Sequence, residues 1–455
     1  DHVLTHRLWG TLIFAAVMVV MFQSIFVWAE APMRWIEAGT QAAGGWITAA
    51  LPPGALRSLL VDGVVAGVGG VVIFLPQILI LFLFIAVLED CGYMARAAYL
   101  MDKLMVRVGL NGKSFIPMLA SFACAVPGIM ATRVIENERD RLTTILVAPL
   151  MTCSARLPIF ALLIAAFVPN VTYLGVFGLQ GFTLVAMYVL GITTAFVAAL
   201  VLKRTILRGD APPFVMELPT YKWPSLRTIA FRVMERGWVF LHTAGTIILA
   251  VSIVIWAALY FPHNADVVEA PFRPQRERLQ AELAQLPPDD AGRAALAHQL
   301  AQLDRQVAGE YQRHSFLGRA GRLVEPVFRP LGWDWRISCA VIASFPAREV
   351  VVATLGVVYH LGDDVDSGSQ EGVSQFRQRL EKATWDGTDR KVFNLPVALS
   401  IMVFFALCCQ CAATLAVIRR ETNSWRWPLF TFTYMTTLAY LGALVTYQVG
   451  MWIGG

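Results

Sequence analysis

Long apolar runs, separated by short polar and basic segments, dominate the pattern of this chain. Six of them exceed the ~20 residues that a helix needs to cross a bilayer: Leu8 to Ala29, Gly63 to Leu88, Leu157 to Leu202, Gly237 to Pro262, Val392 to Ile418 and Trp427 to Gly455. The third run, extended back to Leu142, holds two helices that turn at Val168-Pro169-Asn170. With Ile337 to Tyr359 as a further span, the pattern predicts about eight transmembrane helices.

One apolar segment departs from this pattern. Ser114 to Thr132 is short and contains helix-breaking Pro and Gly, so we expect a broken or re-entrant segment there. Composition agrees with a membrane protein, because the 455 residues are 57% hydrophobic and only 15% charged, with a mean hydropathy of +0.59. The predicted fold class is therefore all-α integral membrane, a polytopic helix bundle with two repeats that contain broken or re-entrant segments.

Polar segments predict the domain organisation. Residues 261–336 are charged, with leucines at helical spacing and a turn at Leu286-Pro287-Pro288-Asp289, which predicts a soluble helical hairpin. This insertion separates a first transmembrane half, 1–260, from a second, 337–455. The polar stretch Asp363 to Lys391 is expected to be a loop.

The distribution of basic residues predicts the topology. Lys and Arg are concentrated after the second and the fourth predicted spans, which puts both loops and the N-terminus in the cytoplasm. Arg419 and Arg420 then fall on the outer side of a simple eight-span count. This conflict indicates that one segment is re-entrant.

Cysteines accompany the helix breakers. Cys124 lies in Ser121 to Gly128 and Cys153 in Met151 to Pro158, both with Pro inside apolar sequence. Broken helices near the middle of the membrane are where transporters bind their cargo, and thiols favour Fe(II), Cu(I) or Zn over Mg or Ca. Further on, Cys408 and Cys411 are expected to share a helix face, with Cys409 pointing elsewhere. The alternative for any single one of these cysteines is a small packing residue.

Acidic residues near the spans are further candidates. Glu349 lies beside Arg348 within a predicted span, and Glu89 and Asp90 end another. A charge in a span costs ~2.5 to 3.5 kcal/mol on insertion scales, so it needs a partner or a function. A structural Arg348–Glu349 pair, a carboxylate partner for Arg156, and an interfacial position for Glu89 and Asp90 are the alternatives.

The sequence also contains a weak internal repeat and lacks several known motifs. Ala120-Ser121-Phe122 is echoed by Ala343-Ser344-Phe345, and Cys153 to Leu157 by Cys411 to Leu415, in the same order. Gly109 to Ser114 lacks two of the residues that a nucleotide phosphate loop needs, and there is no HExxH or paired CxxC motif.

These motifs together resemble a known family. Six runs carry the resemblance: Glu89 to Ala98, Gly109 to Pro117, Cys124 to Pro127, Cys153 to Pro158, Phe345 to Glu349 and Arg420 to Trp425. In sequence and order they resemble the membrane domain of the FeoB family, the prokaryotic ferrous iron transporters, from Asp1 to about Gly450. The resemblance implies a multi-pass protein of the bacterial inner membrane with two Gate-type repeats, the first at about 63–168, that moves Fe(II) into the cytoplasm.

The resemblance also implies roles and partners. It makes Cys124, Cys153 and Cys411 the candidate thiols of an Fe(II) path, with Glu349, Glu89 and Asp90 as candidate acidic groups. The family's GTPase activity, with its GTP and Mg, belongs to an N-terminal domain missing here, so Asp1 is expected to start a fragment that is a transporter and not an enzyme. Implied partners are the lipid bilayer, FeoA- and FeoC-like proteins, the GTP-binding domain and a second copy of the chain, but no nucleic acid.

Three questions remain open from the residues. The cargo is Fe(II), or, alternatively, another divalent metal or a nucleoside-like molecule. The Cys408 to Cys411 cluster allows a membrane thiol redox enzyme as a second alternative. A GTP-gated channel and an alternating-access carrier both fit the sequence.

Overall fold

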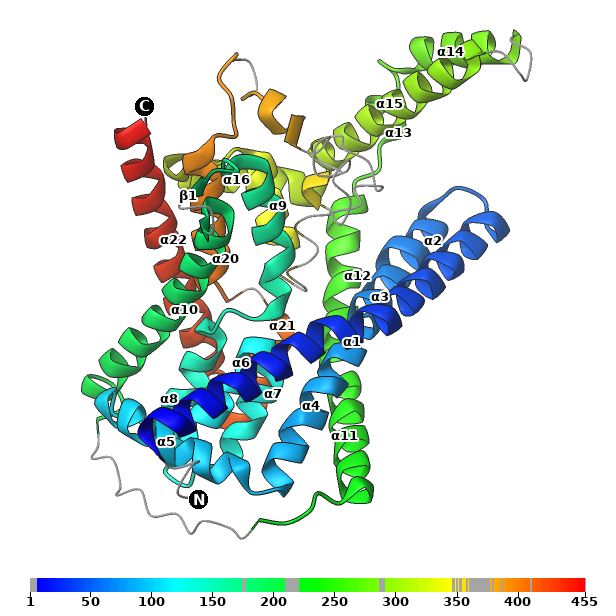
Figure 1. The fold of residues 1–455 in the computed structure, drawn as a ribbon. Helices are drawn as coiled ribbons and strands as arrows, with labels where there is room; N and C mark the ends of the chain where they lie inside the picture. The colour runs from blue at the N-terminus through cyan, green and yellow to red at the C-terminus, as the bar shows by residue number, and fades with distance from the viewer. Residues whose placement is uncertain are drawn as a thin grey trace. The chain divides into compact units, whose positions relative to one another are not determined.

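The computed structural model describes most of the chain, namely residues 6–173, 177–208, 221–285, 291–345, 348, 351, 354–356, 359, 377–378, 380–385, 388–409 and 411–454. The described part is almost entirely helical (Figure 1). Its one small sheet pairs β1 (Thr172–Tyr173) with β2 (Phe177–Gly178) in antiparallel register. The predicted all-α polytopic membrane fold is confirmed.

The chain divides into two compact units, each assembled from separated stretches. The first comprises Asp1–Arg156, Val185–Ile253 and Ala406–Ala439, and the second comprises Leu157–Leu184, Val254–Phe405 and Tyr440–Gly455. The three regions predicted from the sequence stay a prediction.

The first unit contains these helices up to its first chain crossing: α1 (Arg7–Ala50), α2 (Ala55–Ser58), η1 (Leu59–Val65), α3 (Ala66–Val72), α4 (Leu75–Asp90), α5 (Tyr93–Arg107), η2 (Gly112–Ser114), α6 (Phe115–Ala123), α7 (Ala125–Ala131), η3 (Thr132–Val134), α8 (Glu138–Val147), η4 (Ala148–Leu150) and η5 (Ser154–Arg156). It continues with α11 (Leu226–Phe240), η6 (Leu241–Gly245) and α21 (Ala412–Thr422). Three helices run through both units: α10 (Leu179–Arg204), α12 (Thr246–Tyr260) and α22 (Arg426–Gly454). A fourth, α20 (Leu395–Leu407), lies in the second unit up to Phe405.

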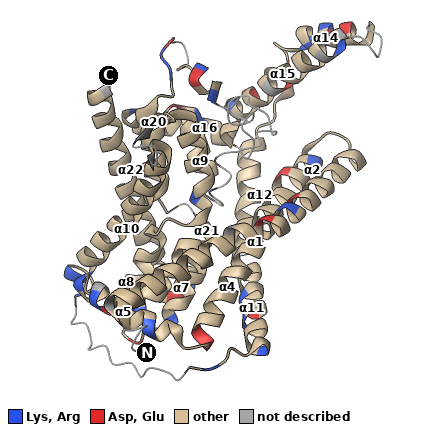
Figure 2. Cartoon of the chain, in the orientation of Figure 1, with Lys and Arg blue, Asp and Glu red and all other residues tan. Residues whose placement is uncertain are grey.

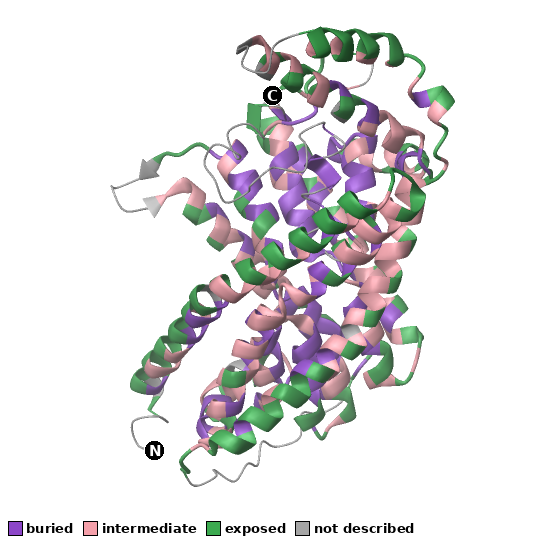
Figure 3. Ribbon diagram, turned by 90° about the vertical axis from the view of Figure 1, so that its right-hand side faces the viewer, coloured by how far each residue is buried: buried purple, intermediate pink, exposed green. Residues whose placement is uncertain are grey.

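The second unit carries the polar insertion and its own core. It contains α9 (Leu157–Phe167), α13 (Ala265–Val268), α14 (Arg273–Gln285), α15 (Ala291–His314), α16 (Phe316–Phe328), η7 (Arg329–Leu331) and α17 (Trp335–Ala343). Leu317, Trp335 and Cys339 pack at the centre of its core. By contrast, α14 is largely exposed, whereas α15, which contacts it, is mostly half-buried and buries Leu303 and Val307. Figure 3 colours the helices by this burial.

Seven helical segments of the described chain are long and apolar enough to cross a membrane: Leu8–Ala50, Ala55–Asp90, Glu138–Phe167, Leu179–Arg204, Leu226–Tyr260, Leu395–Thr422 and Arg426–Ile453. Large apolar side chains stand exposed at helical spacing on some of these segments, as Phe182, Val185 and Val189 do on α10, whereas Leu395–Thr422 is mostly buried. Such stripes are typical of lipid-facing surface. The eighth expected span, Ile337 to Tyr359, begins in α17, and several of its residues after Phe345 lie outside the described part of the chain.

The first helix is longer than predicted. We expected it to end at Ala29, but α1 continues through Glu30, Pro32 and Arg34 to Ala50. Glu30 and Arg34 are exposed one turn apart and form an ion pair at 3.9 Å, so their charges are accommodated in an uninterrupted helix. The helix ends where Leu51-Pro52-Pro53-Gly54 removes backbone donors and rigidifies the chain.

The predicted break within Ser114 to Thr132 is confirmed. Helix α6 ends at Ala123, Cys124 adopts an extended backbone, and α7 starts at Ala125. Gly128 lets the two halves approach closely, because a Cβ at this position would lie 2.0 Å from Ser121 Oγ.

A second close approach lies beside the next break. A Cβ on Gly191 of α10 would lie 2.4 Å from Thr152 Oγ1 and 3.2 Å from the Leu150 carbonyl oxygen. Gly181, on the same helix, has open space around its Cα. Thus α10 supports the segment that leads to Cys153.

A buried ion pair joins α10 to α8 in the first unit. Lys203 Nζ lies 2.5 Å from Asp140 Oδ1, and the two side chains are 6% and 0% exposed. Both charges are removed from water, so each depends on the other. Other Lys and Arg side chains gather near this end of α10 and on α5 and α11 (Figure 2).

Replacing Gly191 with Ala tests the packing of α10 on the break. We expect Gly191→Ala to lower the free energy of unfolding by about 1–3 kcal/mol, because the added methyl overlaps Thr152. The measurement is the thermal unfolding midpoint in detergent. Gly181→Ala is the matched control and should leave the midpoint unchanged or slightly higher; equal losses in both variants would contradict the close approach.

Replacing Lys203 with Met tests the buried pair. We expect Lys203→Met to destabilise the protein by roughly 3–5 kcal/mol, because Asp140 is left buried without its counter-charge. Adding Asp140→Asn to that variant should recover a large part of the loss. Thermal unfolding of the single and double variants measures this coupling, and simply additive losses would show that the two side chains act independently.

Candidate functional site

The three candidate thiols each lie where a helix is interrupted, and all three belong to the first unit. Cys124 separates α6 from α7 with φ −156° and ψ 133°, and Cys411 precedes α21 with φ −161° and ψ 103°. Cys153 lies in the non-helical step between η4 and η5. Backbone groups near such breaks lose their helical partners and need other ones, since lipid supplies none.

Two of the breaks face a common apolar cluster. Cys124 and Cys411 both pack against buried residues that include Val126, Ile145 and Ala413. Helices α7 and α21, which begin at these breaks, contact each other.

An ion pair joins the far ends of α7 and α21. There Arg133 donates to both carboxylate oxygens of Glu421, at 2.9 Å from Nε to Oε2. The two half-helices are therefore held together both at their sides and at their ends.

Ser154 and Arg156 connect the three breaks. Ser154 Oγ donates to the carbonyl oxygen of Ala123 at 3.1 Å, which ties the Cys153 break to the Cys124 break. Arg156, whose side chain is 0% exposed, donates to the Cys408 carbonyl oxygen at 3.3 Å, which ties the Cys153 break to the one before Cys411.

The Arg156 guanidinium also donates hydrogen bonds to backbone carbonyls beside the Cys153 break. It donates to the carbonyl oxygens of Pro149, Leu150 and Met151 at 3.1, 3.3 and 3.2 Å. A carboxylate partner for Arg156 was one interpretation of the sequence; the partners that the structure shows are backbone carbonyls. Because a guanidinium presents five N–H donors in a planar fork, one side chain reaches all four oxygens.

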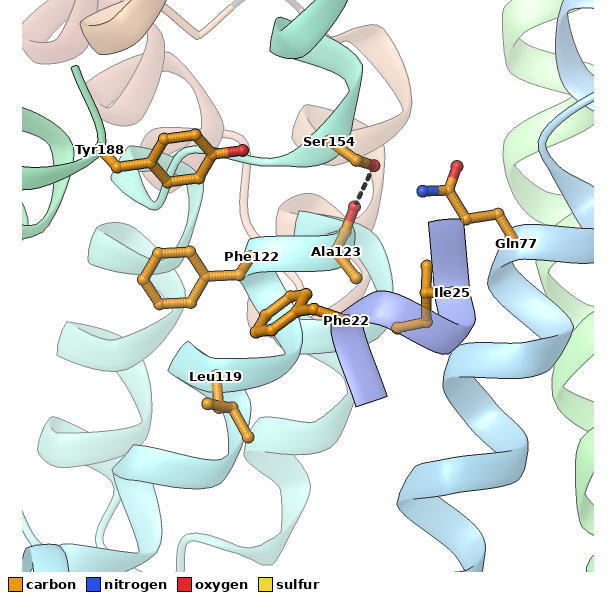
Figure 4. A pocket seen from close by; sticks show the side chains of 8 residues that line it. All are labelled: Phe22, Ile25, Gln77, Leu119, Phe122, Ala123, Ser154 and Tyr188. Atoms are coloured by element: carbon orange, nitrogen blue, oxygen red, sulfur yellow. Dashed lines mark hydrogen bonds between the residues drawn. The ribbon is translucent and has the colours of Figure 1, made fainter. Parts of the chain in front are cut away.

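A cavity of about 350 Å³ opens beside these breaks, lined by Phe22, Ile25, Gln77, Leu119, Phe122, Ala123, Ser154 and Tyr188 (Figure 4). Most of its lining is apolar. Figure 4 shows Ser154 between the hydroxyl of Tyr188 and the amide of Gln77. These polar tips and the Ala123 carbonyl give the cavity oxygen ligands and hydrogen-bonding groups next to the thiol-bearing segments.

Sequence reasoning missed Gln77 and Tyr188. Gln77 is 8% exposed in a helix that is otherwise apolar around it, and a buried polar side chain in a span is itself a signal of function. Tyr188 carries no such signal, because aromatic residues are common in transmembrane helices.

The helix-face argument for Cys408 and Cys411 was wrong. Helix α20 ends at Leu407, so Cys408 and Cys409 lie in the non-helical step that follows and share no helix face with Cys411. Both are 1% exposed, and Cys409 packs in an apolar cluster with Leu150 and Met435. Such burial gives no support to solvent-accessible thiol redox chemistry.

Glu89 and Asp90, two of the candidate acidic residues, contact α11 and the residue that precedes it. Asp90 accepts a hydrogen bond from the Ser225 backbone N–H at 2.8 Å, and Glu89 lies 3.9 Å from Arg232, so both hold the start of α11 against the end of α4. Glu349 lies outside the described residues. Arg348 donates to the Phe405 carbonyl oxygen at 3.5 Å.

Within the part of the chain that the structure describes, no three His, Cys, Asp or Glu side chains come close enough together to hold a metal ion. The thiols are thus distributed along the breaks and do not form one compact cage.

Comparison with known proteins identifies the family. The Gate model, described as nucleoside recognition, matches residues 71–167 and 241–425. A second model, the ferrous iron transport protein B C terminus, matches residues 184–236. No solved structure matches the chain significantly.

Curated relatives agree with these models. The Fe(2+) transporter FeoB of Leptospira interrogans serovar copenhageni is 41% identical over 449 residues, which cover 99% of this chain and 59% of the relative. That of Campylobacter jejuni is 35% identical over 98% of this chain and 64% of the relative. A Porphyromonas gingivalis Fe(2+) transport protein A/Fe(2+) transporter FeoB fusion protein is 41% identical over 99% of this chain and 51% of the relative.

The chain thus spans between half and two thirds of the length of these relatives. The Gate match covers more than half of the chain, and the second model and the relatives all carry the ferrous iron transporter name. This chain belongs to the Gate family, and it is similar over nearly its whole length to proteins named Fe(2+) transporter FeoB.

Proposed function

We propose that this chain is the membrane permease part of a ferrous iron transporter and carries Fe(II) through its first unit into the cytoplasm. The proposal rests on one observation. At three positions, Cys124, Cys153 and Cys411, a cysteine lies where a helix is interrupted, in a chain whose relatives are named Fe(2+) transporters. Ser154 and Arg156 hold these breaks together.

The chemistry of the breaks supports this cargo. Fe(II) accepts soft thiolate and harder oxygen ligands, and each break supplies a sulfur beside non-helical backbone. Conduction requires binding that is strong enough to replace water and weak enough to release the ion. Three separated thiols, each with its own carbonyls, provide a series of weak sites along a path.

The proposed setting follows from the family. The protein lies in the bacterial inner membrane with several spans, and Fe(II) enters from the outer side. In the proposal its movement is regulated by a GTP-binding portion that binds GTP and Mg. The fusion of an Fe(2+) transport protein A to a relative supports a FeoA-like partner, and a FeoC-like protein and self-association complete the proposed assembly.

A nucleoside-like cargo is the second candidate. It is favoured by the description of the Gate model and by the aromatic rings of Phe22, Phe122 and Tyr188 around the cavity, since a base can stack on such rings. The two candidates differ in their dependence on thiols, because only a metal needs the sulfur ligands.

Replacing Cys153 and Cys411 together with Ser tests the path. We expect anaerobic Fe(II) uptake into proteoliposomes to fall to the background rate, because two of the three soft ligands are lost. Uptake is measured with Zn(II), Mn(II) and uridine as competitors. Cys91→Ser is the matched control and should transport as the parent does, because Cys91 hydrogen-bonds the Leu88 carbonyl at the end of α4.

The uptake experiment separates the candidates. Unchanged Fe(II) uptake by the double variant would overturn the assignment of the path. Competition by uridine but not by Zn(II) would favour the nucleoside-like cargo. Where the chain alone shows no uptake, cysteine-dependent Fe(II) binding measured by equilibrium dialysis provides the same comparison between variants.

Replacing Arg156 tests whether the breaks must be held in place. We expect Arg156→Gln to weaken Fe(II) transport by roughly 10- to 100-fold, as the loss of groups that orient metal ligands does. Arg156→Lys should recover little, because an ammonium lacks the planar fork that spans four carbonyls. Fe(II) uptake per folded protein molecule is the decisive readout; uptake equal to the parent's in both variants would mean that Arg156 acts on stability alone.

A further inference from the structure

A second cavity, of about 420 Å³, lies wholly within the second unit. Three arginines line it: Arg322 on α16, Arg329 on η7 and Arg390 in the segment before α20. Glu325 and Asp334 also contribute, so basic side chains outnumber acidic ones. Asp334 is already used by the fold, because its carboxylate accepts from Ile337 N–H at 2.9 Å and from the Tyr359 hydroxyl at 2.8 Å.

The arginines keep most of their donors available. Arg322 donates to the Arg313 carbonyl at 2.9 Å and Arg390 donates to the Tyr447 hydroxyl at 3.2 Å. The Arg329 guanidinium lies over the Trp385 ring at 5.9 Å. Among the described residues none of the three has a carboxylate within ion-pair distance, and each guanidinium offers five N–H donors.

The helix that bears Arg322 has two contrasting faces. Leu317, Gly318 and Gly321 are buried on one side of α16. Phe316, Leu323 and Val327 form an exposed stripe at helical spacing, with Leu323 81% exposed. An amphipathic helix with an exposed apolar stripe beside arginines is typical of helices that lie in a membrane interface.

Two hydrogen bonds hold the end of α16 and η7 against α22. The Tyr440 hydroxyl donates to the Val327 carbonyl at 2.7 Å, and Gln448 donates to the Pro330 carbonyl at 2.8 Å. The span that contains them, Arg426–Ile453, has 28 residues, or ~42 Å of helix, against ~30 Å of hydrocarbon. Tyr440 lies at the middle of α22 and Gln448 near its end, so the end of α16 and η7 pack along the second half of that helix.

We infer that this cavity binds the phosphate of an anionic phospholipid headgroup, while the stripe of Phe316, Leu323 and Val327 contacts the acyl chains. A phosphodiester accepts hydrogen bonds from several guanidiniums at once. A free phosphate would satisfy the arginines but leave the apolar stripe in water. The lipid satisfies both features, so the inference commits to the lipid.

Native mass spectrometry of the detergent-purified protein tests this site. Phosphatidylglycerol, phosphatidylcholine and inorganic phosphate are each titrated against the parent, Arg329→Gln and Arg390→Gln. We expect tight retention of phosphatidylglycerol only, weakened about fivefold for each arginine replaced. Arg319→Gln is the matched control, because Arg319 is exposed on the same helix and does not line the cavity.

Each outcome decides the inference. Selective loss of phosphatidylglycerol in Arg329→Gln and Arg390→Gln, at an unchanged unfolding midpoint, supports it. Equal retention of phosphatidylglycerol and phosphatidylcholine, an equal loss in Arg319→Gln, or binding of inorganic phosphate as tight as that of the lipid would overturn it. The readout does not involve metal, so it is independent of the proposed transport.

Discussion

Backbone hydrogen bonding inside the membrane is the constraint on which this structure depends. A helix that breaks in hydrocarbon leaves carbonyl oxygens that lipid cannot satisfy, and each one costs free energy. The first unit accepts such breaks at Cys124, Cys153 and before Cys411. It does so by placing the guanidinium of Arg156 among four of the carbonyls involved. The breaks and the arginine are therefore one feature of the fold.

The arginine also explains how a site can exist here without a cage of ligands. The Arg156 guanidinium donates to four carbonyl oxygens through its two terminal nitrogens, and in the proposed path its positive charge would oppose the long residence of a cation. In the proposed path, thiols that attract Fe(II) and a fixed cation that repels it would give moderate binding at each step. This balance agrees with the absence, within the described residues, of any three-ligand cluster.

The sequence predicted the membrane class and the break at Cys124 because both have local causes. Long apolar runs require spans, and Pro with Gly inside such a run requires a break. The length of α1 and the end of α20 at Leu407 could not be predicted, since they depend on how exposed charges and neighbouring segments are accommodated in three dimensions. The bond from Arg156 to the Cys408 carbonyl joins residues 252 positions apart and involves a main-chain oxygen, which leaves no trace in residue identity.

Two of the candidate acidic residues, Glu89 and Asp90, make structural contacts of their own. The family resemblance made Glu89 and Asp90 candidates for the ion path, whereas their place at the end of an apolar run favoured an interfacial position. Their carboxylates contact Arg232 of α11 and the Ser225 N–H that precedes this helix. A carboxylate at a helix end is easily used by a neighbouring chain segment, because donors there are plentiful. Glu89 and Asp90 therefore each have a structural contact in this fold, and their place in the proposed path stays a prediction.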